Sequence, residues 1–473
     1  MPHLAVFLAA LACRLSDEDG DPTFRTDDSA GADRDSAGGD TAPTLDLPAP
    51  TPGNLLGDLR GKNVVLVHVD TLRADILPAY GGAHDTMPLL GRRPWQVLDG
   101  LIDASSWTAP STGSLLTGQP PHVHGIRWRT DDGKFLNGGL LVPSLVVRAQ
   151  EAGWRTWAGT GNDYVGDESG TSAGFETVQF TQKQVGSNNL EALLGDASTW
   201  VDGLGAAERF FVFLQPMNMH AVYSPDPEDL GTWADLSALP MDASVGVSHV
   251  FPPHQDAFAR GNDAADARLT QAIRDVYAEQ FLGVDRALDT FLGELERRGR
   301  LQDTVVVLVS DHGETLNDSR DLNFDHGGTL RQELIREPFL VLDGGAVTAP
   351  ARISCVAENV DVLPTLLDAI GLGPTPGIEG RVLTPATCRT RARSVLTREN
   401  DAIYGLVVTD GRYRVSRVCD SGTVLASDLA ADPVGNALIP LTAVPDFADW
   451  IADIDAYLTE IRTAVPGPQC GGG

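Results

Sequence analysis

Positive charge is scarce in this sequence of 473 residues. Lys and Arg together number 35 against 65 Asp and Glu, which gives a formal net charge of −30 at pH 7. Such a chain repels the phosphates of nucleic acids and anionic lipid head groups, so we exclude nucleic-acid binding as a main role. A small anion can still enter a locally positive site. Hydrophobic residues make up 42% of the chain, a share that is ordinary for folded proteins and excludes general disorder.

Cysteine is also rare, with five residues in the chain, and no two of them have the CxxC spacing that is typical of metal clusters. Cys355, Cys388, Cys419 and Cys470 all lie in the last quarter of the sequence. In an exported protein this even number favours disulfides over a metal cluster, and four cysteines allow three pairings. We therefore expect two disulfide bonds without assigning partners. Four unrelated buried thiols are the alternative.

Long apolar runs are missing as well. The run within residues 1–13 spans roughly nine residues, which is too short to cross a bilayer. It ends in small residues before Cys13 and resembles a bacterial lipoprotein signal. This resemblance implies an exported, periplasmic or cell-envelope lipoprotein, tethered to the membrane through Cys13; a truncated secretory signal is the alternative. Residues 14–53, rich in Asp, Gly, Ser, Thr and Pro, predict a disordered acidic linker.

The body of the chain, residues 54–390, alternates apolar runs with amphipathic segments. This alternation predicts an α/β fold, a three-layer sandwich around a large, mixed but mostly parallel sheet. Apolar residues at three-to-four spacing predict a long helix from about Ala267 to Arg298. Residues 391–473 predict a smaller α/β subdomain with an antiparallel sheet, because 403–416 contains two strand-like runs around an Asp-Gly turn. The strands expected in the body are Asn63–Val69, Trp154–Ala158, Phe210–Gln215, Thr304–Ser310 and Pro338–Leu342.

Two of these expected strands end in aspartate. Asp70 follows one of them, and Asp311 follows another and precedes His312. Ligands of open α/β sheets bind beyond the carboxyl ends of the strands, so we expect these three side chains to meet around one cation. Carboxylates suit Ca²⁺, Mg²⁺ or Mn²⁺, whereas an imidazole ligand favours Mn²⁺ or Zn²⁺. The sequence therefore predicts one divalent metal ion, which is Ca, Mn or Zn.

A hydroxyl group precedes a helix-forming run between these two strands. Thr108 is followed by Pro110, which suits the first turn of a helix, and the run closes at Gly118. A helix N-terminus attracts anions, and a threonine hydroxyl becomes a nucleophile when a metal lowers its pKa. We predict that Thr108 is both the nucleophile and a metal ligand beside Asp70, Asp311 and His312. The alternative is that Thr108 only caps the helix.

These residues belong to longer motifs that occur in a fixed order. The motifs are Asp70-Thr-Leu-Arg-Ala-Asp75, Thr108-Ala-Pro110-Ser111 through Leu115-Leu-Thr117-Gly118, Pro121 with His124-Gly125, and Ser310-Asp311-His312-Gly313-Glu314. In this order, over residues 60–435, the chain resembles the sulfatase family of the alkaline phosphatase superfamily. By position, the resemblance gives the nucleophile and the metal ligands as Thr108, Asp70, Asp311 and His312.

The resemblance also implies roles for residues outside these motifs. His220 falls where the family has a histidine that contacts the substrate anion or the leaving group, and we assign it as a catalytic residue. His326 is expected to make a second contact with the substrate anion. Asn162 is a weaker candidate, since its match to the family pattern is looser. His122 and His124 are more simply read as structural histidines.

The sequence departs from the family pattern at four places. Sulfatases that use formylglycine have Cys or Ser at the position of Thr108 and Arg at the position of Thr112. A second metal aspartate is replaced by Thr71, and the family's lysine near Asn162 is absent. These departures argue against formylglycine chemistry and favour an unmodified threonine.

The resemblance and its departures together predict a sulfatase-like, metal-dependent hydrolase of sulfate or phosphate esters. Phosphodiester hydrolysis or phosphoryl transfer is favoured, because few positive side chains suit a singly charged diester. Thr108 would attack phosphorus to form a phosphothreonine, while His220 protonates the leaving alcohol and His326 offsets negative charge. The expected substrate is a small anionic ester, on a glycan or a lipid. The alternative is a catalytically silent protein of this fold that binds an anionic envelope glycan or lipid.

Overall fold

The computed structural model describes residues 47–127, 139–162, 164–181, 189–239, 263–319, 324–346, 351–398, 402–465 and 470. All of them lie in one compact unit that begins at Leu45. Cys13 and most of the predicted linker lie outside the described residues. Of the helices in the described ranges, none combines the length and the apolar character that crossing a bilayer requires.

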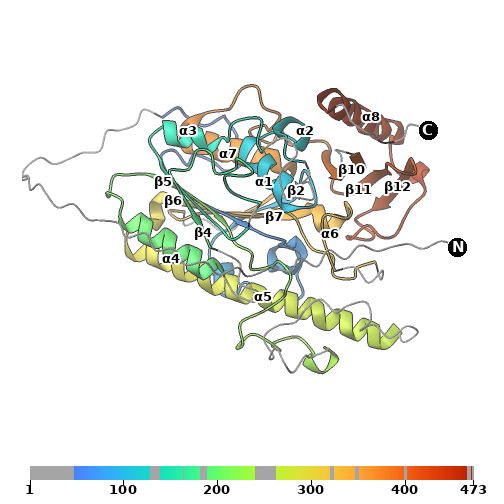
Figure 1. Ribbon diagram of the computed structural model, residues 1–473, viewed down its shortest axis with the longest axis horizontal. Helices are drawn as coiled ribbons and strands as arrows, with labels where there is room; N and C mark the ends of the chain where they lie inside the picture. The colour runs from blue at the N-terminus through green and yellow to red at the C-terminus, as the bar shows by residue number, and fades with distance from the viewer. Residues whose placement is uncertain are drawn as a thin grey trace, which may run out of the picture. The chain divides into compact units, whose positions relative to one another are not determined.

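A sheet of eight strands forms the centre of the protein (Figure 1). Its order is β4-β3-β5-β1-β6-β7-β2-β8. The five strands from β4 to β6 are parallel, β7 is antiparallel to both of its neighbours, and β2 pairs in parallel with β8. The predicted mixed, mostly parallel sheet is therefore confirmed. The strands are β1 Asn63–Val69, β2 Gln96–Ile102, β3 Arg155–Thr160, β4 Thr177–Phe180, β5 Phe210–Gln215, β6 Thr304–Ser310, β7 Arg336–Asp343 and β8 Arg352–Glu358.

Helices cover both faces of this sheet. In Figure 1, α4 (Asn189–Asp202) and α5 (Asp263–Arg297) lie below it, and α1 (Thr108–Thr117), α3 (Val146–Glu151) and α7 (Val362–Leu367) lie above it. Alternate residues of β1 enter different cores because side chains of a strand point to opposite faces. Val65, Val67 and Val69 pack with α4 and α5, whereas Val64 and Leu66 pack with α1, α3 and α7. This arrangement confirms the predicted three-layer sandwich.

The central strands are buried on both faces, which explains their composition. Every residue of β1, β5 and β6 is buried. Parallel strands covered by helices on both sides read as nearly continuous apolar runs, rich in β-branched residues. Fully burying one such side chain contributes roughly 1.5–3 kcal/mol of hydrophobic free energy. The same runs made these three strands predictable with correct bounds.

Three strands of the sheet were not predicted because their sequences lack that signal. In β2, Asp99 and Gly100 interrupt the apolar run, and the pairing register shifts on both sides of the strand. All four residues of β4 are exposed, and β8 begins with largely exposed residues. Two predicted strands also need correction: the one placed at Trp154–Ala158 runs from Arg155 to Thr160, and Pro338–Leu342 extends to Arg336–Asp343.

The long helix α5 anchors a loop on one side of the sheet. It runs from Asp263 to Arg297, close to the predicted bounds. Its buried Glu279 accepts hydrogen bonds from the backbone N–H groups of Gly231, Trp233 and Ala234, at 2.6–3.0 Å. A carboxylate that accepts several backbone N–H bonds holds a loop firmly. The loop fixed in this way follows β5 and contains His220.

A second, antiparallel sheet of four strands follows the central one in the chain. Its order is β12-β11-β10-β9, and α8 (Phe447–Ala464) packs on it through a separate apolar core. The predicted turn lies between β10 and β11, with Gly411 at φ 84°, a conformation that favours glycine. The sequence indicated only two of these strands, which are β9 Ala392–Arg398, β10 Ala402–Thr409, β11 Tyr413–Val418 and β12 Thr423–Asp428.

Two disulfide bonds close the C-terminal part of the chain. Cys355 pairs with Cys388, and Cys419 pairs with Cys470. The prediction of two disulfides is confirmed, and the structure selects one of the three pairings. Disulfides form and persist in oxidising compartments, so they indicate an extracytoplasmic environment for this chain.

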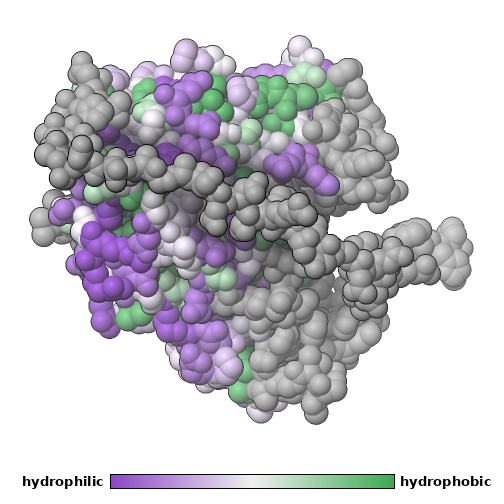
Figure 2. Space-filling model, turned by 60° about the vertical axis from the view of Figure 1, so that its left-hand side comes forward, coloured by the Kyte–Doolittle hydropathy of each residue, from purple (hydrophilic) through white to green (hydrophobic). Residues whose placement is uncertain are grey.

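Polar residues make up much of the described part of one face of the protein. Figure 2 shows hydrophilic residues over much of the face that it presents, with smaller apolar patches between them. Thr51, in the segment predicted as linker, donates hydrogen bonds from its backbone N–H and its hydroxyl to Asp368, at 2.8 and 3.0 Å. The residues just before 54 are therefore held against the body. The domain bounds of 14–53, 54–390 and 391–473 remain predictions.

Candidate metal centre and active site

Four neighbouring parallel strands deliver polar side chains to one edge of the central sheet. β3, β5, β1 and β6 lie side by side in that order. Gln215 is the last residue of β5, Asp70 and Asp311 directly follow β1 and β6, and Asn162 lies two residues after β3. Val69 pairs with Ser310 across β1 and β6, so the two aspartates leave the sheet at the same level. This is the crevice position expected for an open α/β sheet.

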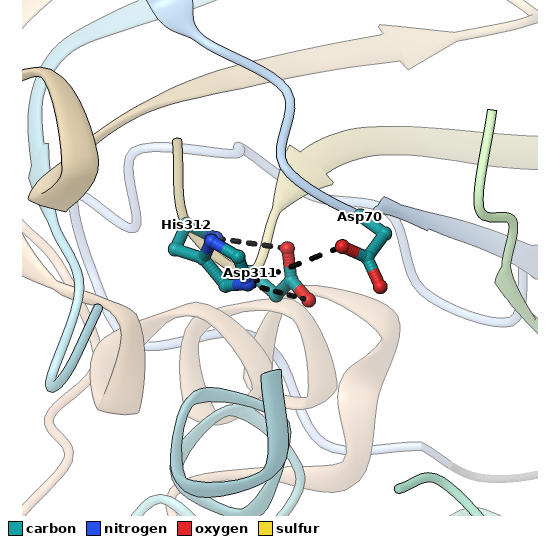
Figure 3. A group of neighbouring side chains, drawn as sticks. All are labelled: Asp70, Asp311 and His312. Atoms are coloured by element: carbon teal, nitrogen blue, oxygen red, sulfur yellow. Dashed lines mark hydrogen bonds and ion pairs between the residues drawn. The ribbon is translucent and has the colours of Figure 1, made fainter. Parts of the chain in front are cut away.

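Asp70, Asp311 and His312 converge at this edge (Figure 3). Each offers a ligand atom within 4.8 Å of the others, and all three side chains are fully buried. The Nε2 atom of His312 lies 3.6 Å from Asp311 Oδ2 and 4.0 Å from Asp70 Oδ1. Its Nδ1 atom lies 2.8 Å from the carbonyl oxygen of Gly313, which fixes the proton on Nδ1 and leaves the lone pair of Nε2 toward the carboxylates.

The electrostatics of this group fit a divalent cation. Burial, followed by the negative charge of Asp70, raises the pKa of Asp311 well above its usual value. Burial, followed by the charge of His326, lowers the pKa of His312 well below its usual value, so the imidazole is neutral. Two buried carboxylates and a neutral imidazole are the donor set of a metal site, and a cation there would relieve the carboxylate repulsion.

The backbone at Thr71 is strained and is held in place by the site. Thr71 has φ 57°, which is unfavourable for a β-branched residue. Its backbone N–H donates a hydrogen bond to Asp311 Oδ1 at 2.9 Å, and its carbonyl oxygen accepts one from the hydroxyl of Tyr277. Strain of this kind persists where surrounding contacts over-determine the backbone, as at functional sites. It orients Asp311 across the gap between β1 and β6.

Thr108 begins helix α1 and points at this group. Its hydroxyl oxygen lies 3.3 Å from His312 Nε2 and 3.5 Å from Asp70 Oδ2. The N-cap residue of α1 is Trp107, and no side chain caps the helix. The alternative role of Thr108 as a helix cap is therefore wrong. Only 2% of Thr108 is exposed, so its hydroxyl is directed into the site and not toward solvent.

Asn162 joins Thr108 to Asp70. Its side-chain amide donates a hydrogen bond to Asp70 Oδ2 at 2.6 Å and lies 3.4 Å from the Thr108 hydroxyl oxygen. Thr160 holds the loop, because its hydroxyl accepts a hydrogen bond from the backbone N–H of Asn162. Asn162, which the sequence indicated only as a weaker candidate, therefore lies among the proposed metal ligands.

A buried histidine fixes the position of α1. The Nε2 atom of His124 lies 3.1 Å from both the Ser114 hydroxyl and the Pro110 carbonyl oxygen, and its Nδ1 accepts the N–H of Ile126. A Cβ atom at Gly113 would lie 2.7 Å from the His124 ring, so this close approach requires glycine. His124 is thus a structural residue, as the sequence indicated, and it sets where Thr108 points.

The rings of His326 and His220 continue outward from His312 in the metal group. The ring centre of His326 lies 4.5 Å from that of His312 and 5.0 Å from that of His220. His326 Nδ1 is 3.2 Å from Glu314 Oε1. Burial alone would lower the pKa of His326, but the negative charges of Glu314, Asp70 and nearby Asp325 raise it to about 9. In the metal-free protein, His326 is therefore a cation at neutral pH.

The turn after Asp311 packs tightly on the short helix α6 (Gln332–Ile335). A Cβ atom at Gly313 would lie 1.9 Å from the backbone oxygen of Glu333, so only glycine fits there. Glu333 itself is buried, and neither of its carboxylate oxygens has a hydrogen-bond partner among the described residues. Burial, followed by the charge of Asp318, raises the pKa of Glu333 to about 7. Ionisation of this carboxyl group therefore lowers the free energy of unfolding.

Replacing Glu333 with glutamine is expected to stabilise the protein above pH 7. A folded-state pKa above the unfolded one gives stability that is present below the unfolded value, near 4.5, and is lost as the pH rises through about 7. Glutamine has no charge to bury, so we expect a gain of about 2 kcal/mol in unfolding free energy at pH 8 and little change at pH 4.5. Urea unfolding at both pH values measures it. The exposed Glu296→Gln is the control, and equal effects of both variants at pH 8 would contradict the prediction.

The structure brings together all the residues that the sequence selected. Asp70, Thr108, Asp311 and His312 form one group, and His326 and His220 continue from it. Sequence reasoning missed Gln215, whose Nε2 lies 3.2 Å from Asp311 Oδ2, and Glu314, the partner of His326. The rule that found the aspartates would also have found Gln215, since it ends an apolar strand.

Comparisons with known proteins agree with the family that the sequence motifs indicate. The Sulfatase family model matches residues 62–372. The chain is 26% identical over 352 residues to the low-salt glycan biosynthesis sulfotransferase Agl7 of Haloferax volcanii, which covers 73% of this chain and 71% of that protein. Among solved structures, BT4656 in complex with its substrate D-glucosamine-2-N,6-O-disulfate superposes with TM-score 0.63 at 18% identity, over 85% of this chain and 98% of that one.

A phosphonate monoester hydrolase of Agrobacterium radiobacter gives the same fold, with TM-score 0.63 and 18% identity over 85% of this chain and 95% of that one. At such identities the structural likeness speaks for the fold alone. The family model, however, covers well over half of the chain and includes the two strand-end aspartates and Thr108. By its sequence and its fold, this chain belongs to the sulfatase family of the alkaline phosphatase superfamily.

Proposed function

We propose that this protein is a metal-dependent hydrolase of sulfate or phosphate esters in which unmodified Thr108 is the nucleophile. The observation that carries the proposal is the position of the Thr108 hydroxyl, 3.3 Å from His312 Nε2 and 3.5 Å from Asp70 at the start of α1. Asp70, Asp311 and His312 would hold one divalent ion, of Ca, Mn or Zn, with Thr108 completing the set. When bound, the ion supplies positive charge that makes a neighbouring hydroxyl more acidic and polarises the ester.

The residues around Thr108 favour phosphodiester hydrolysis or phosphoryl transfer over formylglycine chemistry. Thr108 occupies the position of the family's formylglycine. Thr112, four residues later, is buried, and its hydroxyl has no hydrogen-bond partner within the described ranges. No guanidinium group is therefore available from that position to clamp a doubly charged anion. Without that guanidinium group, His326 and His220 supply less positive charge to the site. This suits a diester, which carries a single negative charge.

The reaction balances with groups already in place. The Thr108 oxygen attacks phosphorus while its proton passes to Asp70 Oδ2, the acceptor it faces in the structure. The bond from phosphorus to the leaving oxygen breaks, and His220 donates a proton to that oxygen. Water, or a second alcohol, then attacks phosphorus and gives its proton to His220, the bond from phosphorus to the Thr108 oxygen breaks, and Asp70 returns its proton to that oxygen. His326, paired with Glu314 at 3.2 Å, offsets charge on the non-bridging oxygens.

The experiment is an assay of the purified protein, first stripped with a chelator and then supplied with Mn²⁺, Zn²⁺ or Ca²⁺. The substrates are an aryl sulfate, an aryl phosphate monoester and a bis-aryl phosphate diester. We expect the diester to have the highest kcat/KM, and mass spectrometry of a quenched reaction to find phosphate on Thr108. Because one relative is named a sulfotransferase, an acceptor alcohol is included to detect transfer. Faster turnover of the sulfate would contradict the phosphodiester preference.

The proposal extends to the location of the enzyme. Disulfides Cys355–Cys388 and Cys419–Cys470 support an oxidising compartment, as does the signal-like segment at residues 1–13. An acidic linker at 14–53 and a lipid on Cys13 would hold the catalytic body, residues 54–390, at the cell envelope. Its substrate would then be an anionic ester on an envelope glycan or lipid.

A further inference from the structure

A cavity of about 340 Å³ lies on the C-terminal sheet, outside the metal group. Residues of β9 to β12 form one wall, and residues 329–331 form another. Its volume falls in the range of small-molecule sites, about 300–1,000 Å³. Neither the metal group nor the three histidines line it. It therefore needs an explanation of its own.

Positive charge is concentrated in this cavity. Arg331, Arg414 and Arg417 line it, and none of its described lining residues is acidic. The Nε atoms of Arg414 and Arg417 are buried, and neither has a hydrogen-bond partner among the described residues. Buried donors are normally satisfied by protein, water or a ligand. The chain as a whole carries a net charge of −30, so the positive charge of these three arginines is opposite in sign to that of the chain.

The positive charge persists at neutral pH. Burial lowers the pKa of Arg414 to about 10, with Glu333 opposing the shift and Arg331 adding to it. Arg417 donates a hydrogen bond from Nη1 to Asp455 at 2.7 Å, but the side chain of Asp455 is 57% exposed and screened by water. Guanidinium groups present parallel donors that match the oxygens of sulfate and phosphate. The cavity is thus suited to one such group.

A short segment connects the cavity to the metal group. His326, at one end, lies beside His312 with its ring tilted, and Arg331, five residues later, lines the cavity. Five residues span at most about 18 Å. Leu330 packs in the same apolar cluster as Trp107, the residue before Thr108. The cavity therefore lies within about 18 Å of His326, a distance that one extended ligand could span.

The other lining residues are mixed, since Leu330, Leu396, Leu406, Val407 and Leu425 are apolar and others are polar, and a mixed lining suits a saccharide. Ser319, Thr329, Ser416 and Asn436 offer hydroxyl or amide groups, and the hydroxyl oxygen of Thr329 is buried without a partner in the described part of the chain. Leu438 at the rim is 59% exposed, which gives an apolar surface for a sugar face. Hydroxyl and amide groups along the wall distinguish the cavity from an acyl-chain site, which would be apolar throughout.

We propose that this cavity is a second anion subsite, which binds a sulfate or phosphate group on a saccharide whose reacting ester lies at Thr108. The inference rests on the proposed function, because it takes Thr108 as the reacting centre. It narrows the substrate class to saccharides that carry at least two anionic groups. Arg414 and Arg417 are then specificity-determining residues that act on binding and not on the chemical step.

The test measures equilibrium binding by calorimetry with Mn²⁺ present, using one disaccharide with two sulfate esters and the same disaccharide with one. We expect the native protein to bind the disulfated form about tenfold more tightly, the size of a charge-assisted contact. Arg417→Gln and, separately, Arg414→Gln should each remove most of this preference without changing affinity for the monosulfated form. Arg297→Gln, an exposed arginine on α5 with 72% exposure, should retain the full preference. Thermal unfolding confirms that each variant is folded.

Loss of the preference in Arg297→Gln, or its retention in both cavity variants, would overturn the proposal. Equal binding of both sugars to native protein, with co-sedimentation of anionic phospholipid vesicles that Arg417→Gln abolishes, would assign the cavity to a lipid instead. The readout does not depend on turnover. If no ester is hydrolysed but the preference follows the cavity arginines, the proposed function fails and the subsite stands.

Discussion

Replacing Thr108 with alanine is expected to lower kcat/KM by at least about 10³-fold, the usual cost of losing a nucleophile. The hydroxyl of Thr108 lies 3.3 Å from His312 Nε2 and 3.5 Å from Asp70, and alanine leaves water as the attacking group without its positioning. Thr108→Ser keeps the oxygen and should retain activity within about tenfold of the native protein. Mass spectrometry of quenched reactions should find no covalent phosphate in the alanine variant.

The matched control for this variant is Thr112→Ala. Thr112 is a buried threonine on the same helix, and its hydroxyl has no hydrogen-bond partner among the described residues. We expect its replacement to change kcat/KM by less than about threefold, because the lost methyl and hydroxyl groups do not touch the reacting atoms. If Thr108→Ala kept a tenth of the native activity, Thr108 would not be the nucleophile.

The second large effect concerns Asp311. We expect Asp311→Asn to abolish turnover and weaken metal binding by more than about 10²-fold, since a charged ligand becomes neutral. In the metal-free protein, the same change should raise the unfolding free energy at pH 8, because it removes a buried carboxyl group that no cation pairs. The sign follows from the raised pKa of Asp311: its contribution to stability is present below its unfolded pKa and lost as the pH rises through the folded one. Above its unfolded pKa, this carboxyl group therefore destabilises the metal-free protein.

The local contacts make asparagine easy to accommodate at this position. Its amide oxygen can still accept hydrogen bonds from the backbone N–H groups of Thr71 and His312, both at 2.9 Å in the native protein. Gln215 faces Asp311 Oδ2, and the Gln215 amide oxygen has no partner in the described ranges, so a flip of this amide pairs it with the new NH₂ group.

The measurement is urea unfolding of both proteins, first in chelator and then with saturating Mn²⁺. Metal binding stabilises only the native protein, so the order of stability should reverse between the two conditions. The control is Asp58→Asn, at an exposed surface pair with Arg60. Its effect on the free energy of unfolding should be the same in chelator and with Mn²⁺. If Asp311→Asn were destabilised in chelator as strongly as with metal, the carboxylate would be a structural residue and not a ligand.

The sequence could identify functional residues where a reactive side chain follows a recognisable local pattern. Asp70 and Asp311 end strands buried on both faces, and such strands are continuous apolar runs that mark their own last residue. The long helix α5 was predictable because its apolar stripe repeats from Leu269 to Leu295. Strands β4 and β8 could not be predicted in this way, since they lie at the edges of the sheet and contain exposed residues, and in β2 Asp99 and Gly100 interrupt the apolar run.

Parts of the site depend on contacts between distant segments. Glu314 matters through His326, twelve residues away, and Asn162 through Asp70 and Thr108. No local pattern marks such pairs, because side-chain hydrogen bonds across the fold leave no periodic signal. The arginine cavity is a further example: Arg331, Arg414 and Arg417 come from separate segments. The pairing of the four cysteines was likewise open until the fold placed them.

The register between β1 and β6 has a consequence for how relatives of this protein can diverge. Val69 and Ser310 are backbone partners in the middle of the sheet, so ladder hydrogen bonds set the spacing between the two ligand carboxylates. Insertions or deletions in the peripheral loops leave that spacing intact. Evolution, or an engineer exchanging those loops between homologues, can therefore change which molecule is accepted while the two carboxylates proposed to hold the cation stay in place.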